Sequence, residues 1–411
     1  MAKDGSEAPQ APRDPKTGGA LSGVTVGDLS RVLGGPFATQ LLADHGADVI
    51  KLEPPQGDEV RDWGPPFHED DAAYFIGVNR NKRSVGLDLS REEGRDVLLR
   101  LLADADVLIE NFKPGSMEAW GIGYEDLKER FPQLIYCKIS GFGNDGPLGG
   151  FPGYDGIVAA MAGHYSVNGS QESGPMRLGL PVVDISMGLY CVIGILLAMH
   201  DRATCGEGQA IEVTLYDSAM SLMHPHFPNY FLSGKVPPLT GNQHTTLVPY
   251  GMFQTKTVPV MLGAGNNRAF RKVCDVLGRP ELADDPRFAT NGDRLEHRDE
   301  LNQIIIEKLA EVDGITFALE LLKAGLPCGP VLDTGQVAES EHTRARGMVY
   351  EDGWYKGTGT PVRLSRTPGG MKSPPPKFSA HAREVLAEHG FDDTAIEKLA
   401  AAGVLVEKRR V

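Results

Sequence analysis

The sequence predicts an α/β protein with a large domain built on a doubly wound parallel sheet and a second, smaller α/β unit. Short apolar segments alternate with helical ones from residue 24 to residue 140, which is typical of a parallel sheet covered by helices. The alternation stops in residues 224–254, which are rich in Pro, Gly, Asn and His, and a new strand-and-helix pattern follows. A chain of 411 residues is also too long for one ordinary core, so two domains are expected.

The first strand–helix–strand unit precedes residue 54. Residues 24–26 have the composition of a short strand, Gly34-Gly35-Pro36 interrupts it, and residues 37–44 have helical spacing. Residues 48–53 form the next predicted strand. Two strands joined by a helix within about thirty residues indicate a parallel pair with a right-handed crossover.

The pattern repeats as far as Ser140. Strands are predicted at residues 84–89, 106–112 and 134–140, and helices at residues 91–105 and 124–131. Ser90 and Glu93 have the spacing of a capping box for the first of these helices. Ligands of such sheets bind at the carboxyl ends of the strands. Those ends fall at residues 30–35, 53–56, 89–91, 111–115 and 140–146.

Asp184 stands at the start of a long apolar run, residues 185–199. Position alone favours a helix N-cap, because aspartate accepts hydrogen bonds from the free N–H groups of a first turn. The alternative is chemical, since the positive end of a helix stabilises an ionised carboxylate and makes it a nucleophile at neutral pH. The run itself is too short and too interrupted to span a bilayer, so a buried core helix is expected.

A glycine loop marks the second unit. The loop Gly263-Ala264-Gly265 lies between a predicted strand at residues 258–262 and a predicted helix at residues 268–277. Its backbone N–H groups can stabilise an oxyanion, but a plain strand-to-helix turn is an equal alternative. A dinucleotide fingerprint is disfavoured, because Arg268 occupies the third glycine position and no acidic residue follows at the expected spacing.

Composition and motifs exclude several other classes. The net charge of −14 is spread along the chain, which argues against nucleic acid and anionic membranes as partners. The five cysteines include no C-x-x-C pair, so free thiols and a cytoplasmic location are expected. Zinc-ligand spacing, a Walker motif and a Gly-x-Ser-x-Gly elbow are missing, and no metal site is predicted. Residues 1–20 are polar with three prolines, which indicates a disordered tail rather than a signal peptide.

Basic residues suited to phosphate are few. The densest run is Asn79-Arg80-Asn81-Lys82-Arg83, which is either a solvated turn or a phosphate site. Lys113 lies at a predicted carboxyl end and is a second candidate.

Together these residues resemble class III CoA-transferases, the carnitine and bile-acid-inducible group that includes formyl-CoA transferase. The resemblance covers nearly all of residues 21–399 and rests on segments that follow in order at matching spacing. These segments are residues 35–44 (GPFATQLLAD) with 50–53, 81–84 with 87–89, 111–115 (NFKPG), 140–143, 284–288 (DDPRF) and 327–331 (PCGPV).

The resemblance implies ring-shaped subunits that interlock in a homodimer, each with a Rossmann-like large domain and a small α/β domain. The C-terminal part of the chain is expected to complete the large domain. The predicted regions are the tail at 1–20, the first part of the CoA-binding large domain at 21–223, a linker and pocket segment at 224–254, the small domain at 255–331, and the return linker and completion of the large domain at 332–411.

The resemblance also implies a covalent mechanism, and its catalytic aspartate falls on Asp184. That carboxylate would attack an acyl-CoA thioester, form a mixed anhydride and then carry CoA as an aspartyl thioester. CoA thioester is therefore a substrate, a free carboxylic acid is the acceptor, and no permanently bound cofactor is expected. Gly263, Ala264 and Gly265 match the family loop that covers the aspartate, where they would bind the oxyanion and exclude water.

The family's CoA contacts fall on Val32, Leu33, Leu87, Asp88, Asn111, Phe112, Lys113 and Tyr154. Leu33 replaces a glutamine of formyl-CoA transferase. Positions that are basic there are Pro54, Ala119 and Pro152 here. Arg83 is therefore assigned to the CoA site, with Arg80 and Arg91 as alternatives for the phosphates.

Two other activities remain open beside transfer. Racemases of the superfamily use a His-Asp step at the glycine turn, where this chain has Tyr154-Asp155, so the base and acid that racemisation needs are incomplete. A non-catalytic Rossmann relative is the third interpretation. The Asn, His and Thr residues of segment 224–254 suit a short polar or dicarboxylic acid as the acceptor.

Overall fold

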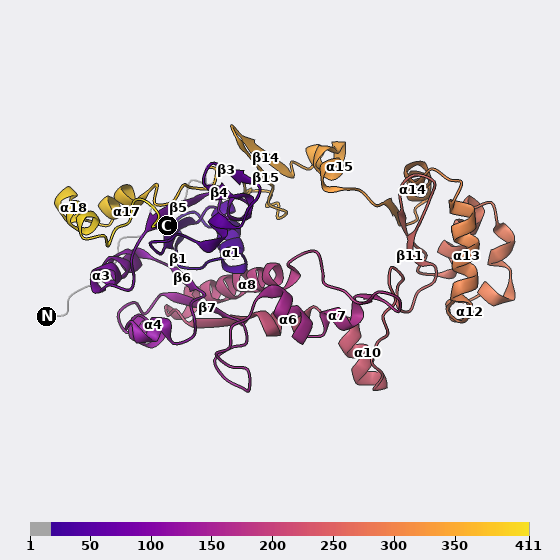
Figure 1. The fold of residues 1–411 in the computed structure, drawn as a ribbon, viewed down its shortest axis with the longest axis horizontal. Helices are drawn as coiled ribbons and strands as arrows, with labels where there is room; N and C mark the ends of the chain where they lie inside the picture. Colours follow the sequence, from indigo (N-terminus) through magenta and orange to yellow (C-terminus); the bar gives the residue numbers. More distant parts are fainter. Residues whose placement is uncertain (1–17, 411) are drawn as a thin grey trace. The chain divides into compact units, whose positions relative to one another are not determined.

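A computed structural model describes residues 18–410, and most of the predicted tail at residues 1–20 lies outside them. The described chain forms two compact units, whose elements are labelled in Figure 1. The first unit contains residues 18–163, 178–224 and 346–410, and the second contains residues 164–177 and 225–345.

A six-stranded parallel sheet forms the centre of the first unit, in the order β10-β7-β6-β1-β2-β5. Its strands are β1 (Thr25–Asp28), β2 (Asp48–Glu53), β5 (Lys82–Gly86), β6 (Val107–Glu110), β7 (Ile135–Ser140) and β10 (Ala210–Thr214). The chain adds β2 and β5 on one side of β1, then returns to add β6, β7 and β10 on the other. The winding reverses between β1 and β6, so the loops after these strands diverge and leave a crevice. The predicted parallel α/β sheet is confirmed.

The long helix α8 (Val182–Cys205) packs against α1 (Gly34–Asp44), and the two lie side by side in Figure 1. Two glycines allow this close approach. A Cβ on Gly34 would lie 2.1 Å from Cε of Met187, and a Cβ on Gly188 would lie 2.6 Å from the carbonyl oxygen of Gly34. The contact holds the loop before α1 against the first turn of α8.

The chain returns to the first unit at residue 346 and covers β5, the edge strand of the sheet. The Val406 N–H donates to the carbonyl oxygen of Gly86 at 2.9 Å, and Leu405 forms an antiparallel bridge with Leu87. Helix α17 (Ala382–Glu388) packs on β5 and is drawn in yellow beside it in Figure 1. Covering an edge in this way satisfies backbone groups that would otherwise be free to pair with another chain.

The remaining elements of the first unit are short. They are η1 (Glu59–Asp62), β3 (Phe67–His68), β4 (Asp71–Ala72), α2 (Ala73–Ile76), α3 (Glu92–Leu101), η2 (Leu102–Asp104), α4 (Ser116–Ala119), α5 (Tyr124–Lys128), α6 (Asp155–Met161), α9 (Leu215–Ser221), β14 (Val349–Asp352), β15 (Tyr355–Thr358) and α18 (Asp393–Ala401).

The second unit is built on an antiparallel sheet, β11-β12-β13, with a core that contains Phe270, Phe288 and Phe317. Its strands are β11 (Tyr250–Phe253), β12 (Val260–Gly263), β13 (Cys328–Pro330), β8 (Gly169–Ser170) and β9 (Gly174–Pro175). Its helices are α7 (His164–Val167), α10 (His226–Ser233), α11 (Asn267–Val276), η3 (Pro280–Ala283), η4 (Pro286–Phe288), α12 (Asn291–Glu296), α13 (Arg298–Leu309), α14 (Gly314–Lys323), α15 (Thr334–Glu339) and α16 (Glu341–Ala345).

The predicted capping box at Ser90 is wrong. Helix α3 has Arg91 at its N-cap and no side-chain cap. The Ser90 hydroxyl instead donates to Oδ1 of Asp88 at 2.6 Å. The local Asx-type contact competes successfully with the cap.

The apolar run after Asp184 is helical, as predicted, but the helix is longer than the run and is buried on one side only. Helix α8 has 24 residues and, by length and composition alone, could cross a membrane. One side packs on α1, α9, β7 and β10, while the other side exposes Leu189, Ile193 and Leu197. These residues follow each other at i, i+4 and i+8, so they form a single apolar stripe.

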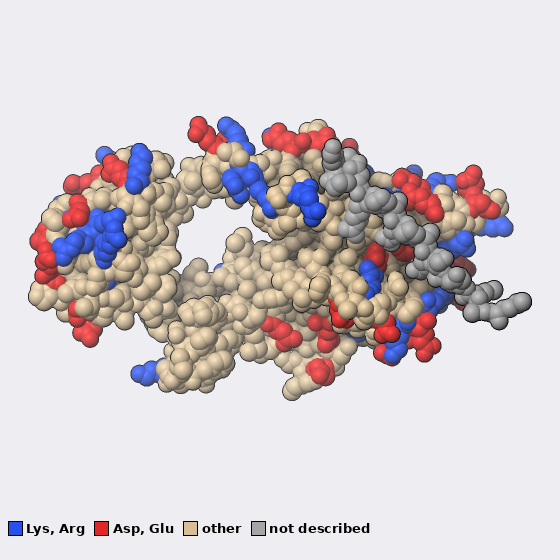
Figure 2. All heavy atoms as spheres, turned by 180° about the vertical axis from the view of Figure 1, so that it is seen from behind, with Lys and Arg blue, Asp and Glu red and all other residues tan. Residues whose placement is uncertain are grey.

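Acidic and basic side chains are intermixed on the face shown in Figure 2. On that face, among the described residues, Lys and Arg do not merge into one continuous basic surface.

Candidate active site

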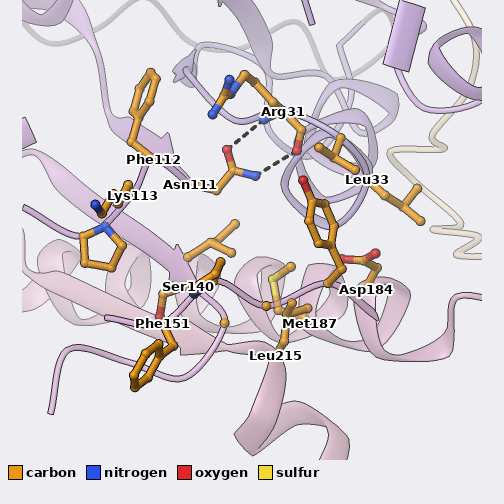
Figure 3. A pocket seen from close by; sticks show the side chains of 18 of the residues that line it. Arg31, Leu33, Asn111, Phe112, Lys113, Ser140, Phe151, Asp184, Met187 and Leu215 are labelled. Carbon is orange, nitrogen blue, oxygen red and sulfur yellow. Dashed lines mark hydrogen bonds between the residues drawn. The ribbon is translucent and has the colours of Figure 1, made fainter. Parts of the chain in front are cut away.

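A pocket with an accessible volume of about 450 Å³ lies in the first unit at the crevice between β1 and β6 (Figure 3). Loops at the carboxyl ends of β1, β6 and β7 and the first turn of α8 form its walls, where ligands of open α/β sheets bind. The lining residues are Arg31, Val32, Leu33, Gly34, Glu59, Asn111, Phe112, Lys113, Pro114, Ile139, Ser140, Gly141, Gly150, Phe151, Pro152, Gly153, Tyr154, Asp184, Met187 and Leu215.

The loop after β1 is held in a strained conformation. Val32 has a φ of 71°, in the left-handed region that β-branched residues rarely adopt. The Arg31 N–H donates to Oδ1 of Asn111 at 2.9 Å, and Nδ2 of Asn111 donates back to the Arg31 carbonyl at 2.8 Å. Oδ1 of Asp58 accepts from the Val32 N–H at 3.1 Å. Such strain persists where the surroundings over-determine it, which is common at ligand sites.

Buried ion pairs also hold the loop after β1 in place. Nζ of Lys51 lies 3.0 Å from Oδ2 of Asp58 and donates to the Ser30 carbonyl at 2.9 Å. Asp28 accepts from the Ser30 N–H and pairs with Lys82 at 3.0 Å. Burial raises the pKa of Asp28, but the Lys82 and Lys51 charges outweigh it and lower the pKa to about 2. Asp28 therefore stays ionised at neutral pH and keeps its contacts with Ser30 and Lys82.

Asp184 is the third residue of α8, and the prediction that it caps this helix is wrong. The N-cap position is Pro181, which has no side chain able to cap. Oδ2 of Asp155 does the capping instead: it accepts from the N–H groups of Val183 at 2.9 Å and of Asp184 at 3.1 Å. Because Asp155 satisfies the first turn, the Asp184 carboxylate is left facing the pocket, as Figure 3 shows.

The Asp184 carboxylate is also less acidic than expected. Burial, followed by the charge of Asp155, raises its pKa from 3.8 to about 7. The N-terminus of α8 was expected to stabilise the ionised carboxylate and so to lower its pKa. That effect does not outweigh burial and the charge of Asp155. Near pH 7 the side chain is therefore divided between its ionised, nucleophilic form and its protonated form.

This pKa makes the reaction pH-dependent. With an acyl-CoA as the varied substrate, we expect kcat/KM to fall about tenfold per pH unit below pH 7, because only the carboxylate attacks a thioester. Asp155→Asn removes the repelling charge but keeps an oxygen to cap α8, so the midpoint should move to lower pH. Rates measured between pH 5 and pH 9 test this.

Asp217→Asn is the matched control, since Asp217 is the third residue of α9 and does not line the pocket. Its profile should coincide with that of the unmodified protein. An unchanged midpoint in Asp155→Asn would contradict the electrostatic coupling between the two aspartates.

A second pocket of about 310 Å³ adjoins the first. It lies at the carboxyl ends of β2 and β5, and Phe112 lines both pockets. The lining residues are Leu52, Glu53, Pro54, Pro55, Gln56, Leu87, Asp88, Leu89, Ser90, Phe112, Trp120 and Arg410.

The structure brings most of the predicted CoA residues together in these two pockets. The first holds Val32, Leu33, Asn111, Phe112, Lys113 and Tyr154 with Asp184, and the second holds Leu87 and Asp88 with Phe112. Gly263, Ala264 and Gly265 belong to the second unit, where Gly263 ends β12 and the other two residues lie between β12 and α11.

Arg83, Arg80 and Arg91 line neither pocket. Arg83 pairs with Asp48 and Glu388 at 2.6 Å each. Arg80 is buried against Asp44, and Arg91 binds the Ala402 carbonyl and Glu93. The structure thus places none of these three arginines with the predicted CoA contacts.

Sequence reasoning missed Arg31, the capping role of Asp155 and the Lys51–Asp58 pair. One signal was available, since Lys51 interrupts an otherwise apolar predicted strand, Val49-Ile50-Lys51-Leu52. A charge within a buried strand requires a partner. Within residues 18–410, no cluster of His, Cys, Asp and Glu has the arrangement of a metal site.

Comparison with known proteins identifies the class. Residues 21–382 match the model of CoA-transferase family III. The chain is 40% identical to succinate–glutarate CoA-transferase of Agrobacterium fabrum over 90% of this chain and 95% of that protein. It is 39% identical to acetyl-CoA:oxalate CoA-transferase of Acetobacter aceti over 86% and 91%.

A solved structure agrees with these relatives. The crystal structure of a CAIB/BAIF family protein from Brucella suis matches with a TM-score of 0.84 and 40% identity, covering 90% of this chain and all of that one. The chain therefore belongs to CoA-transferase family III, as the sequence motifs indicated. It is a class III CoA-transferase, and the acyl-CoA thioester is its substrate.

Proposed function

We propose that this enzyme transfers CoA from an acyl-CoA donor to a short dicarboxylic acid through covalent intermediates on Asp184. The main support is the position of the carboxylate. It lies in the pocket that also holds most predicted CoA contacts, and its side chain forms no hydrogen bond to another residue among residues 18–410. An acyl group can therefore reach it without first breaking a protein contact.

The proposed reaction begins when an Oδ atom of Asp184 attacks the thioester carbonyl carbon. The C–S bond breaks, CoA leaves as a thiolate, and a mixed anhydride remains. The thiolate then attacks the Asp184 carbonyl carbon and releases the donor acid as a carboxylate, which leaves an aspartyl-CoA thioester. The acceptor carboxylate repeats these steps in reverse, and the thioester bond energy is retained.

Burial serves this mechanism in two ways. It raises the free energy of the ionised nucleophile, which is the cause of the raised pKa. It also limits access of water, which would hydrolyse the anhydride. The oxyanion role of Gly263, Ala264 and Gly265 remains a prediction from the family resemblance.

The acceptor class is proposed from the relatives. Glutarate and oxalate are named for two proteins of about 40% identity, and both are dicarboxylic acids. The residues of segment 224–254 that suggested a polar acid are in agreement with this class.

We also propose that the enzyme is a homodimer. The exposed stripe of α8 supports it: Leu189 is 46% exposed, Ile193 50% and Leu197 64%. A contiguous apolar stripe of this kind typically marks a protein interface. The interlocked arrangement itself rests on the family resemblance.

Mass spectrometry tests the covalent mechanism. After incubation with succinyl-CoA, the peptide that contains Asp184 should carry CoA, and hydroxylamine should convert the same residue to a hydroxamate. Incorporation of solvent deuterium at the α-carbon of the acyl group without acyl exchange would instead indicate a racemase. Absence of all these signals, together with no CoA affinity, would overturn the proposal.

A further inference from the structure

Arg31 is a cation of the active-site pocket for which the structure provides no counter-ion. It forms no ion pair among residues 18–410, and its buried Nε has no hydrogen-bond partner among them. Its backbone cannot move away easily, because both its N–H and its carbonyl are bound by Asn111. A buried guanidinium nitrogen without a partner is unfavourable. An anionic ligand is therefore expected to accept a hydrogen bond from this nitrogen.

The guanidinium lies where the two pockets meet. Its Cζ is 5.4 Å from the ring centroid of Phe112. Phe112 is the one residue shared by the linings of the 450 Å³ and 310 Å³ pockets in the described chain. In Figure 3 the Arg31 side chain extends toward Phe112, and Asp184 lies across the pocket from its charged end. The cation is therefore placed away from the nucleophile.

An acyl-CoA is an elongated molecule with the thioester at one end, adenosine 3′-phosphate at the other and a diphosphate between pantetheine and adenosine. The proposed function places the thioester at Asp184. The second pocket, which contains Leu87 and Asp88, is then left for the adenosine end. The diphosphate must cross the junction at Phe112, where Arg31 lies.

We propose that Arg31 binds the diphosphate of CoA, a proposal that rests on the proposed function. Its planar, permanently charged guanidinium suits two phosphate oxygens at once. Lys113 also lines the first pocket and forms no ion pair among the described residues, so it adds a second cation to this site. The remaining charged residues of the lining are Glu59 and Asp184, both acidic.

The second pocket has a basic residue of its own, Arg410, but this side chain is already engaged. Its Nη2 donates to the Gly403 carbonyl at 2.6 Å, and its Nη1 lies 3.7 Å from Asp88. Arg31 is thus a cation with a free donor beside Phe112, at the junction. Arg31 would thus supply positive charge that basic residues of formyl-CoA transferase supply from the positions of Pro54, Ala119 and Pro152 in this chain.

Calorimetric binding to the full-length Arg31→Met variant tests the proposal with three ligands: CoA, 3′-dephospho-CoA and pantetheine. Loss of charge-assisted bonds should weaken CoA and 3′-dephospho-CoA by roughly 10- to 100-fold, since both contain the diphosphate. Pantetheine, which lacks it, should bind the variant and the unmodified enzyme equally. Arg31→Lys keeps the charge but not the planar donors. It should weaken the binding of CoA and 3′-dephospho-CoA less than Arg31→Met does, and it should leave pantetheine binding unchanged.

Arg130→Met is the matched control, because the Arg130 guanidinium also lies 5.4 Å from an aromatic ring, that of Phe131, but lines neither pocket. It should bind all three ligands normally.

Equal weakening of pantetheine would overturn the proposal and show a structural role for Arg31. Weakening of CoA alone would assign Arg31 to the 3′-phosphate, and a higher KM for glutarate with normal CoA affinity would assign it to the acceptor acid; either contradicts the proposal. Calorimetric binding does not require turnover, whereas CoA transfer is measured in a separate activity assay. A failure of the proposed transfer reaction can therefore be distinguished from a failure of the proposed role of Arg31.

Discussion

Asp184→Ala is expected to abolish CoA transfer, with a fall in kcat of at least about ten-thousand-fold, because the variant lacks the nucleophile of both covalent intermediates. CoA binding should be retained. The contacts of CoA are spread along the two pockets, and Asp184 occupies only the end where the thioester reacts. Transfer from succinyl-CoA to glutarate and calorimetric CoA affinity are the two measurements.

Asp217→Ala provides the comparison, because it removes a carboxylate from the equivalent third position of α9. That variant should keep its transfer activity. If Asp184→Ala lost CoA affinity as completely as activity, the residue would be structural, and the covalent mechanism would have to be abandoned.

Asp184→Asn is expected to stabilise the fold at pH 8 by roughly 4 kcal/mol, and not at pH 4, because asparagine has nearly the same shape and no charge to bury. The ordinary pKa of 3.8 applies to the unfolded chain, whereas burial and Asp155 raise the folded value to about 7. This difference corresponds to roughly 4 kcal/mol.

The sign follows from proton binding. Between pH 3.8 and about 7 the folded chain holds a proton on Asp184 that the unfolded chain has lost, so the free energy of unfolding decreases as pH rises through this range. Denaturant unfolding of both proteins at pH 4, 6 and 8 should therefore show a difference that grows with pH. A constant difference would mean that the substitution acts through packing rather than through charge.

Local patterns predicted the individual elements well. The strand expected at residues 48–53 is β2 with the same bounds, and the one expected at residues 134–140 is β7. The helix expected at residues 268–277 differs from α11 by one residue at each end. Apolar periodicity and glycine breaks are short-range signals, so single elements follow from them.

Strand order and the return of the chain are long-range properties, and no local pattern contains them. The antiparallel bridge between Leu87 and Leu405 joins residues more than three hundred positions apart. The exposed side of α8 was missed for a related reason. Composition shows that Leu189 and Leu197 are apolar, but it does not show whether the protein itself covers them.

The site was predictable in its location and only partly in its chemistry. The carboxyl ends of β1, β6 and β7 were expected to bind a ligand, and the pocket is there. The capping of α8 by Asp155 was not foreseeable, because 28 residues separate it from Val183. Arg31 lay within a predicted ligand-binding end, but its lack of a counter-ion becomes visible only when all neighbouring carboxylates are placed.

The covering of β5 by the C-terminal segment has a consequence for biosynthesis. Val406 and Leu405 pair with the edge of a sheet whose first strand, β1, begins at Thr25. A ribosome releases the chain from its N-terminus, so the six strands leave the exit tunnel long before the segment that covers their edge. During that interval the nascent sheet has an open edge at β5. The segment that ends the exposure of the β5 edge to edge-to-edge aggregation is therefore synthesised after all six strands of the sheet.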